Sequence, residues 1–168
     1  AQIRDRAEQE LGEMQERLLF ALDAAELVIW QWNSRDGQVI CSPGARHLFG
    51  LQSGPAHEFT SRIHPEDLPR VQESYIQAAR STRSFDVEFR YWRDDSWRWL
   101  VIRGRVEDDG DNVRRITGIS MDITDRKAAE QRLQEATERF RLIVDNALDY
   151  AIFTFDLAGR VTSWNPGA

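Results

Sequence analysis

Apolar residues recur at every third or fourth position over residues 1–25, whereas they alternate with polar residues over several later stretches. The first spacing places apolar side chains along one side of a helix, and alternation places them on one face of a strand. We therefore predict an amphipathic helix over residues 1–25, with an apolar stripe that includes Leu11, Met14 and Leu18.

Five later stretches have the alternation, or the β-branched and aromatic content, of β-strands. The first two flank the turn residues SRDG and predict a β-hairpin, and the last two flank DDGDN, which contains the Asp-Gly turn signal. The predicted strands are residues 27–33, 38–42, 85–92, 97–106 and 113–123.

Residues typical of helix ends mark two helices between the second and third strands. Ser42 is placed as an N-cap, Pro43 as the first helical residue and Gly50 just past the end of a short helix. A second helix is predicted to start at Pro65, because proline suits the first helical position. Its buried stripe is predicted to consist of Leu68, Val71, Tyr75 and Ala78. This order of elements indicates an α+β fold with an antiparallel sheet.

The stretch GISMDITDRKAAEQRL changes from strand spacing to helix spacing within about one residue. The helix that follows has apolar residues at alternating intervals of four and three, a heptad seam of the kind that pairs helices in a coiled coil. The seam consists of Ala129, Leu133, Ala136, Phe140, Ile143 and Ala147. We therefore predict a homodimer that pairs through this helix, through the stripe in residues 1–25, or through both.

Residues 151–168 repeat the pattern of the first predicted hairpin. Phe153 and Phe155 stand where Trp30 and Trp32 stood, and the tripeptide Pro-Gly-Ala follows both hairpins. The turn of the second copy is one residue shorter. We interpret the second copy as the start of a repeated unit that is cut short.

Composition narrows the possible functions. The 168 residues are 41% hydrophobic and 30% charged, which is typical of a soluble globular protein. The net charge of −6 argues against a nucleic acid as the main partner, because neutralising phosphates needs a basic surface. The sequence has no apolar run long enough to span a membrane, no signal peptide and a single cysteine. We therefore expect a cytoplasmic location with no membrane contact in this fragment, and any membrane anchor of the parent protein to lie elsewhere.

Several of these stretches together resemble a PAS domain followed by a PAC motif. The resemblance rests on the paired tryptophans before DGQV, then on HPED, FDVEFR, RWLVIRGRV and GISMDITDRKAAE, in this order. The Asp-Gly turn that usually precedes RW reads Asp95-Ser96-Trp97 here. The predicted organisation is an N-terminal helix (1–25), a PAS/PAC domain (26–125), a coiled-coil-like linker helix (126–148) and the truncated start of a second PAS domain (149–168).

The resemblance implies a five-stranded antiparallel sheet with short helices on one face, a cavity between them, and a role as sensor and relay in signal transduction. Asp122, Ile123 and Thr124 are the candidate relay residues at the joint between strand and helix, where Asp122 or Thr124 can cap the helix. The candidate cavity residues are Trp32, Phe49, Leu68, Val71, Tyr75, Phe89, Trp99 and Ile119. The candidate dimer-seam residues are Leu11, Met14, Leu18, Leu133, Phe140 and Ile143.

The sequence carries no signature of a known PAS cofactor. Some PAS domains bind haem through a histidine on the long helix, and others bind flavin through a cysteine in an NCRFLQ-like stretch, and neither pattern occurs here. The cofactor is therefore unknown, and Cys41 is interpreted as a small buried thiol. His47, His57 and His64 have no metal-binding spacing, so we predict no metal site and assign them structural or exposed roles.

The sequence contains no nucleophile with its base, no phosphate loop and no convergent carboxylates, so we do not expect this fragment to be an enzyme. The resemblance implies a downstream effector, a histidine kinase first and a cyclic-di-GMP synthase or phosphodiesterase as the alternative. Two functions stay open, a module that senses a small, mostly apolar or organic-acid ligand and a ligand-free dimerisation spacer. Binding to single-stranded nucleic acid is a third reading, based on the alternation of Trp97 and Trp99 with arginines, which strand alternation also explains.

Overall fold

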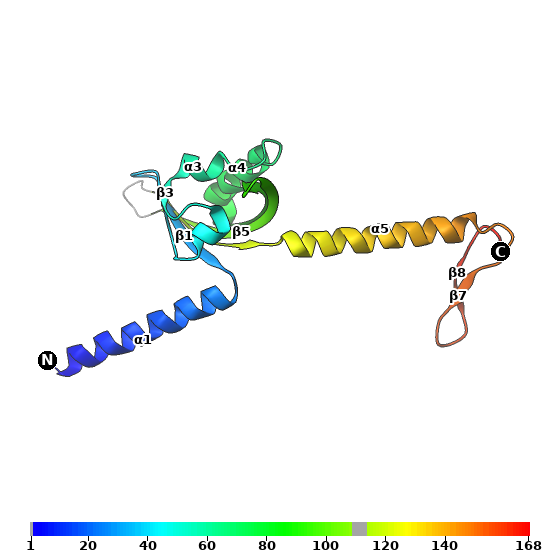
Figure 1. Ribbon diagram of the computed structural model, residues 1–168, viewed down its shortest axis with the longest axis horizontal. Helices are drawn as coiled ribbons and strands as arrows, with labels where there is room; N and C mark the ends of the chain where they lie inside the picture. The colour runs from blue at the N-terminus through cyan, green and yellow to red at the C-terminus, as the bar shows by residue number, and fades with distance from the viewer. Residues whose placement is uncertain (1, 109–113) are drawn as a thin grey trace. The chain divides into compact units, whose positions relative to one another are not determined.

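The alternating stretches of the sequence form β-strands in the computed structural model, which describes residues 2–108 and 114–168. The chain divides into two units, Ala1–Thr124 and Asp125–Ala168 (Figure 1). The hairpin tip predicted at DDGDN lies largely outside the described residues. The elements of the first unit are α1 (Gln2–Ala24), β1 (Val28–Asn33), β2 (Gln38–Cys41), α2 (Ala45–Phe49), β3 (Gly54–Pro55), α3 (Ala56–Thr60), α4 (Leu68–Gln77), the π-helix η1 (Ala78–Thr82), β4 (Ser84–Arg93), β5 (Ser96–Asp108) and β6 (Arg114–Asp122).

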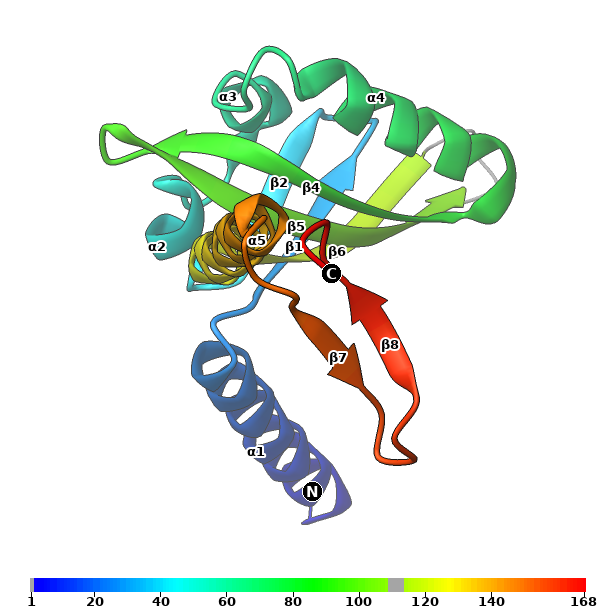
Figure 2. The ribbon, with the colours of Figure 1, turned by 90° about the vertical axis from the view of Figure 1, so that its right-hand side faces the viewer.

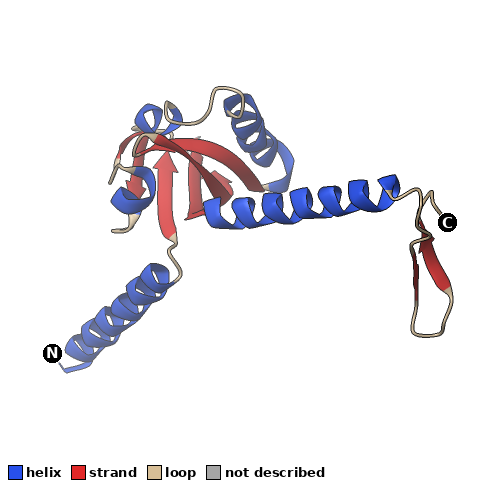
Figure 3. Ribbon diagram, turned by 45° about the vertical axis from the view of Figure 1, so that its right-hand side comes forward, coloured by secondary structure: helices blue, strands red, loops and turns tan. Residues whose placement is uncertain are grey.

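The strands of the first unit pair in one antiparallel sheet in the order β3-β2-β1-β6-β5-β4. The five long strands are those expected for a PAS fold, and the two-residue β3 extends the edge beside β2. The helices α3 and α4 lie across one face of the curved sheet (Figures 2 and 3). The predicted α+β fold with a single antiparallel sheet is therefore confirmed.

Strand pairing determines which side chains face the helices. Phe89 of β4 lies opposite Leu100 of β5, which lies opposite Asp122 of β6. Trp30 of β1 lies opposite Gly118, an even number of residues from Asp122, so its side chain points to the same face of the sheet. Successive strand residues point to opposite faces, so the inward-facing side chains are fixed once one of them is known. The most deeply buried inward side chains are Phe89, Tyr91, Leu100 and Val106, and they pack with Val71 of α4.

Two glycines on the neighbouring strands β6 and β5 make room for aromatic rings from the strands on either side of them, β1 and β4. Gly118 and Gly104 lie side by side on β6 and β5, between Trp30 of β1 and Phe85 of β4. A Cβ atom on Gly118 would lie 2.5 Å from the Trp30 ring, and one on Gly104 would overlap the Phe85 ring. The Trp30 indole is also held by a hydrogen bond of 2.8 Å from its Nε1 to the hydroxyl of Ser120.

The short helices begin at different residues from those predicted. The N-cap of α2 is Gly44, and the hydroxyl of Ser42 instead accepts a hydrogen bond of 3.0 Å from the backbone of Ile29. The helix α4 begins at Leu68 because residues 65–67 form a turn before it. The predicted cap at Ser42 and the predicted start at Pro65 are therefore wrong, whereas Gly50 ends α2 with a positive φ of 69°, as expected.

The second unit contains most of α5 (Thr124–Asn146) and a hairpin of β7 (Phe153–Phe155) and β8 (Val161–Trp164). The pairing of β7 with β8 has a register shift between Thr154 and Phe155. Residues 156–160 connect these two strands, against residues 34–37 in the first hairpin, so the connection is not shorter in the structure. Within the described residues, neither α1, α5 nor any other helix has a stretch apolar and long enough to cross a lipid bilayer.

Candidate functional site

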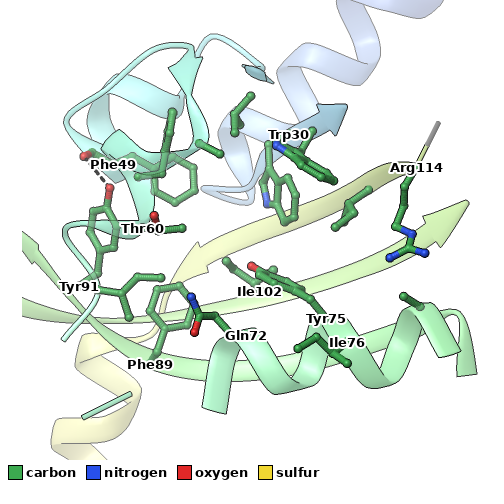
Figure 4. A pocket seen from close by; sticks show the side chains of 17 residues that line it. Trp30, Phe49, Thr60, Gln72, Tyr75, Ile76, Phe89, Tyr91, Ile102 and Arg114 are labelled. Carbon is green, nitrogen blue, oxygen red and sulfur yellow. Dashed lines mark hydrogen bonds between the residues drawn. The ribbon is translucent and has the colours of Figure 1, made fainter. Parts of the chain in front are cut away.

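A cavity of the first unit has a volume of about 370 Å³ and lies between the inner face of the sheet and the helices α3 and α4 (Figure 4). This volume falls within the range of small-molecule pockets in proteins. Its wall is mostly apolar and rich in aromatic rings. The lining residues are Trp30, Trp32, Val39, Phe49, Ala56, Phe59, Thr60, Ile63, Gln72, Tyr75, Ile76, Ala79, Phe89, Tyr91, Ile102, Arg114 and Ile116.

Several polar groups in the cavity wall already bind to the protein itself. The hydroxyl of Tyr91 donates to the carbonyl of Phe49 at 3.4 Å, and the hydroxyl of Thr60 donates to the carbonyl of His57 at 3.4 Å. Burial raises the pKa of the Tyr75 hydroxyl, so this group stays neutral at physiological pH. The cavity therefore offers a neutral, largely apolar surface, apart from the side chains of Gln72 and Arg114.

Only some of the residues that we predicted to line the cavity do so in the structure. Trp32, Phe49, Tyr75 and Phe89 line the cavity. Leu68 and Val71 belong to α4, as expected, but they do not line it. Val71 is fully buried in the core, and Leu68 is partly buried against it, so both fill space beside the cavity rather than border it.

Trp99 and Ile119 are not cavity residues, because they point to the other face of the sheet. Phe89 pairs with Leu100, which places Leu100 and Ile102 on the inner face and Trp99 on the outer face. Ile119 lies next to Gly118, whose inward side is covered by Trp30, so Ile119 faces outward and is 36% exposed. A shift of one residue along a strand exchanges the two faces. The prediction of Trp99 and Ile119 in the cavity is therefore wrong.

The alternation also identifies lining residues that the sequence analysis missed. Trp30 lies two residues before Trp32, Tyr91 two after Phe89, and Ile102 and Ile116 lie on the inner faces of β5 and β6. The same parity brings Arg114, two residues before Ile116, to the cavity.

Cys41 and His64 are held by contacts within the protein and lie outside the set of residues that line the cavity. Cys41 is half-buried at the end of β2, and desolvation raises the pKa of its thiol to about 11, which keeps it in the unreactive protonated form. The Nδ1 of His64 accepts a hydrogen bond of 3.2 Å from the backbone of Glu66, and its ring packs against Trp97 at 4.6 Å between centroids.

The predicted relay residues form a tight connection between the sheet and α5. The carboxylate of Asp122 accepts a hydrogen bond of 2.8 Å from the backbone N–H of Thr124, the first residue of α5. The Thr124 hydroxyl accepts from the backbone N–H of Trp99 in β5 at 3.0 Å, so it holds the neighbouring strand rather than the helix end. Ile123 between them is only 3% exposed, and its N–H donates to the carbonyl of Trp99 at 2.8 Å.

A charged network connects the start of α4 with the same part of the sheet. The buried carboxylate of Asp67 accepts hydrogen bonds from the backbone N–H, Nε and Nη2 of Arg90, at 2.8 to 2.9 Å. Its hydrogen bonds with Arg90 lower the pKa of Asp67 to about 2, against the opposing effect of burial. The Arg90 guanidinium lies 6.0 Å over the ring of Trp99, the residue bonded to Thr124.

The candidate dimer-seam residues are exposed in the single chain. Leu133 is 70% exposed, and the other members on α5 and α1 are exposed to a similar degree. Large apolar side chains aligned on one helix face are typical of helices that pair with a partner helix.

The second unit repeats a contact of the first. In the first hairpin Ile29 and Ser42 exchange two hydrogen bonds, Ile29 N–H to the Ser42 hydroxyl and Ser42 N–H to the Ile29 carbonyl. Ile152 and Asn165 exchange the same two bonds in the second hairpin, at 2.8 and 3.0 Å. The Asn165 amide nitrogen also lies 3.0 to 3.1 Å from three backbone carbonyls, those of Val144, Ala147 and Tyr150, and so connects the hairpin to the end of α5.

Comparison with known proteins places this arrangement in a family. A profile of the family described as PAS fold matches residues 38–120. The probable diguanylate cyclase DgcE of Escherichia coli K12 is 29% identical over 180 residues, which cover the whole chain and 16% of that protein. The sensor protein FixL of Bradyrhizobium diazoefficiens is 29% identical over 144 residues, which cover 83% of the chain and 28% of that protein.

A solved structure extends the comparison to three dimensions. The sensory box histidine kinase/response regulator from Burkholderia thailandensis E264 is 30% identical and superposes with a TM-score of 0.61, covering 74% of this chain and 98% of that one. The chain spans less than a third of the length of the curated relatives that it matches. The fold, the match to the profile and these relatives together show that the chain belongs to the PAS-fold family of sensory signalling modules.

Proposed function

We propose that this module binds a small, mostly apolar ligand in its cavity and passes the change in occupancy to α5. The observation that carries the proposal is that the same two strands both line the cavity and hold the start of α5. Strands β5 and β6 contribute Ile102 and Ile116 to the cavity wall, and their other ends hold the first residue of α5 through Trp99 and Asp122. A ligand that favours one arrangement of the sheet would therefore also favour one setting of the helix start.

The output would come from the parent protein rather than from this fragment. We assign the fragment no catalytic activity and place the effector beyond residue 168. A histidine kinase is the first candidate, and a cyclic-di-GMP enzyme is the alternative. The relatives support both, since they include a sensory box histidine kinase and a probable diguanylate cyclase.

The organisation proposed for the parent is a cytoplasmic homodimer. The exposed apolar seam of α5 and the stripe on α1 would pair two chains and present two aligned copies of the effector. The hairpin β7–β8 would open a second PAS domain after the linker helix. Support for the second domain comes from the matching hydrogen bonds of Ile29 with Ser42 and of Ile152 with Asn165.

Native mass spectrometry of the gently purified chain tests the ligand-binding role. We expect one small molecule per chain, lost when Ala79→Phe places a ring in the cavity. The matched control is Ala128→Phe, which adds the same ring at an exposed position of α5. A wild-type chain that carries no small molecule, and that takes none up from a library of apolar metabolites, would instead support a ligand-free dimerisation spacer.

A further inference from the structure

Of the residues that the structure describes, 17 line the cavity, and Arg114 is the only charged one among them. It begins β6 and lies opposite Asp108 of β5, on the same face of the strand as Ile116. Its backbone is held by two hydrogen bonds with Ser34 at the end of β1, each of 2.9 Å. Figure 4 shows the guanidinium at one end of the cavity, and the rest of the wall is mostly apolar, with Thr60 and Gln72 as uncharged polar exceptions.

The positive charge of Arg114 is only partly balanced by its neighbours. The Asp108 carboxylate binds Arg83 at 2.6 Å but lies 3.4 Å from the Nε of Arg114. A strong bond between a guanidinium and a carboxylate is about 2.7 to 2.9 Å long, so Asp108 is engaged mainly by Arg83. Arg83, Asp108 and Arg114 together carry a net positive charge, and of the three only Arg114 lines the cavity.

The cavity size limits the ligand. If each non-hydrogen atom needs roughly the 30 Å³ that a water molecule occupies in the liquid, a cavity of about 370 Å³ holds about a dozen such atoms. A molecule of this size that filled the apolar part would reach from the rings of Phe49 and Phe89 towards Arg114. The wall therefore suits a ligand that has an apolar body and one anionic end.

We propose that the ligand is an amphiphilic carboxylate, whose apolar part lies among the aromatic rings and whose carboxylate binds the guanidinium of Arg114. This inference rests on the proposed ligand-binding function. Arginine suits the role because its planar fork of N–H groups matches the two oxygens of a carboxylate. A neutral molecule of the same shape would fill the apolar part and leave the arginine without this partner.

Calorimetric titration with decanoate and with decan-1-ol, both below their aggregation concentrations, tests the proposal. Decanoate has the expected number of non-hydrogen atoms, and decan-1-ol keeps its chain but lacks the charge. We expect decanoate to bind more tightly than decan-1-ol, and Arg114→Ala to weaken decanoate binding by roughly threefold to fivefold, because the Arg114 side chain is half exposed, while leaving decan-1-ol unchanged. Arg114→Lys should retain part of the preference, and added salt should reduce it.

Arg115→Ala is the matched control, because it removes the same charge from the next residue, on the opposite face of β6. It should leave both affinities unchanged, and thermal unfolding should show that each variant is folded. Equal binding of decanoate and decan-1-ol, or equal effects of the two alanine variants, would overturn the carboxylate assignment and leave the ligand-binding function intact. Binding of neither probe, together with no small molecule in the native mass spectrum, would remove the ligand-binding function itself.

Discussion

The hydroxyl oxygen of Thr124 accepts a hydrogen bond of 3.0 Å from the backbone N–H of Trp99. The next residue back along the chain, Ile123, donates its own N–H to the carbonyl of Trp99 at 2.8 Å. The first residue of α5 and the residue before it are thus bonded to β5 through both backbone groups of Trp99. Both bonds lie within the first unit, which ends at Thr124.

Replacing Thr124 with valine should loosen this attachment. Valine keeps the shape of the side chain but removes the acceptor for the Trp99 N–H, which should lower the free energy of unfolding by about 1 kcal/mol or somewhat more. Urea unfolding measures the change. Thr137→Val is the control, because the exposed Thr137 hydroxyl binds only a carbonyl of its own helix. An equal loss in both variants would contradict the special role of Thr124.

The length of the linker should determine the output of the parent protein. Deleting one residue between Thr124 and Ala129 should turn the seam by roughly 100° relative to the sheet, whereas deleting seven residues of α5 should largely restore its direction. Effector activity of the full-length parent should therefore change or invert with the first deletion and be largely preserved with the second. Equal activity at every linker length would exclude a relay through α5.

The ion pair of Asp67 with Arg90 should make stability depend on pH in the acid range. The folded-state pKa of Asp67 is about 2, below its ordinary value of 3.8, so its contribution is complete above about pH 4 and is lost as the pH falls towards 2. Asp67→Asn should lower the free energy of unfolding at pH 7 by about 2 kcal/mol. The gap between wild type and variant should narrow as the pH falls from 4 to 2.

Chemical denaturation at a series of pH values measures this gap. Glu66→Gln is the matched control, because Glu66 binds the same Arg90 from an exposed position. Glu66→Gln should lower the free energy of unfolding at pH 7 by less than Asp67→Asn does. A constant gap between wild type and Asp67→Asn from pH 7 to pH 2 would contradict the assignment.

The turn between β4 and β5 should accept glycine with a gain in stability. Asp94 and Asp95 both have positive φ angles, 50° and 56°, which suit a type I′ turn and favour glycine at its second position. We expect Asp95→Gly to raise the free energy of unfolding by about 0.5 to 1 kcal/mol. Asp94→Gly should gain less, because it also removes an ion pair of 2.8 Å with Arg93. A lower melting temperature for Asp95→Gly would refute the prediction.

A charge in the seam of α5 should weaken the proposed dimer. Leu133→Glu would place two carboxylates opposite each other in the paired helices, where desolvation and repulsion oppose association. Sedimentation should show a shift towards monomers, while circular dichroism shows an unchanged fold. Gln134→Glu adds the same group beside the seam and should have little effect. A wild-type chain that stays monomeric at high concentration would rule out the seam.

The sequence predicted the strands well because most of them alternate clearly between polar and apolar residues. Residues 99–102 do not alternate, since Trp99, Leu100, Val101 and Ile102 are all apolar. The structure explains why, because Val101 on the outer face is only 5% exposed. With both faces of β5 covered at residues 100–102, the sequence pattern could not show which of these residues point inward. The wrong placement of Trp99 follows from this.

Cavity and core are equally apolar, so composition could not separate Tyr75, which lines the cavity, from Val71, which does not. Arg114 lies on the inner face of β6, two residues before Ile116, but a charged residue at the start of a strand adds no apolar signal that would assign it to a cavity. Likewise, Ser42 and Asp67 have side chains suited to helix caps, but tertiary partners use these side chains instead.

The buried side chain of Asn165 has a mechanical consequence. Its amide nitrogen lies within hydrogen-bond distance of the carbonyl of Val144 in α5 and of the carbonyls of Ala147 and Tyr150 in the connection. Its amide oxygen accepts from the backbone N–H of Ile152, just before β7, so one side chain bonds to both ends of the connection. A rotation of α5 about its axis would therefore be passed on to β7 through these bonds, whereas a flexible linker would let the helix rotate alone. The stiffness of the connection is thus set by one amide group, which lies far along the chain from the cavity.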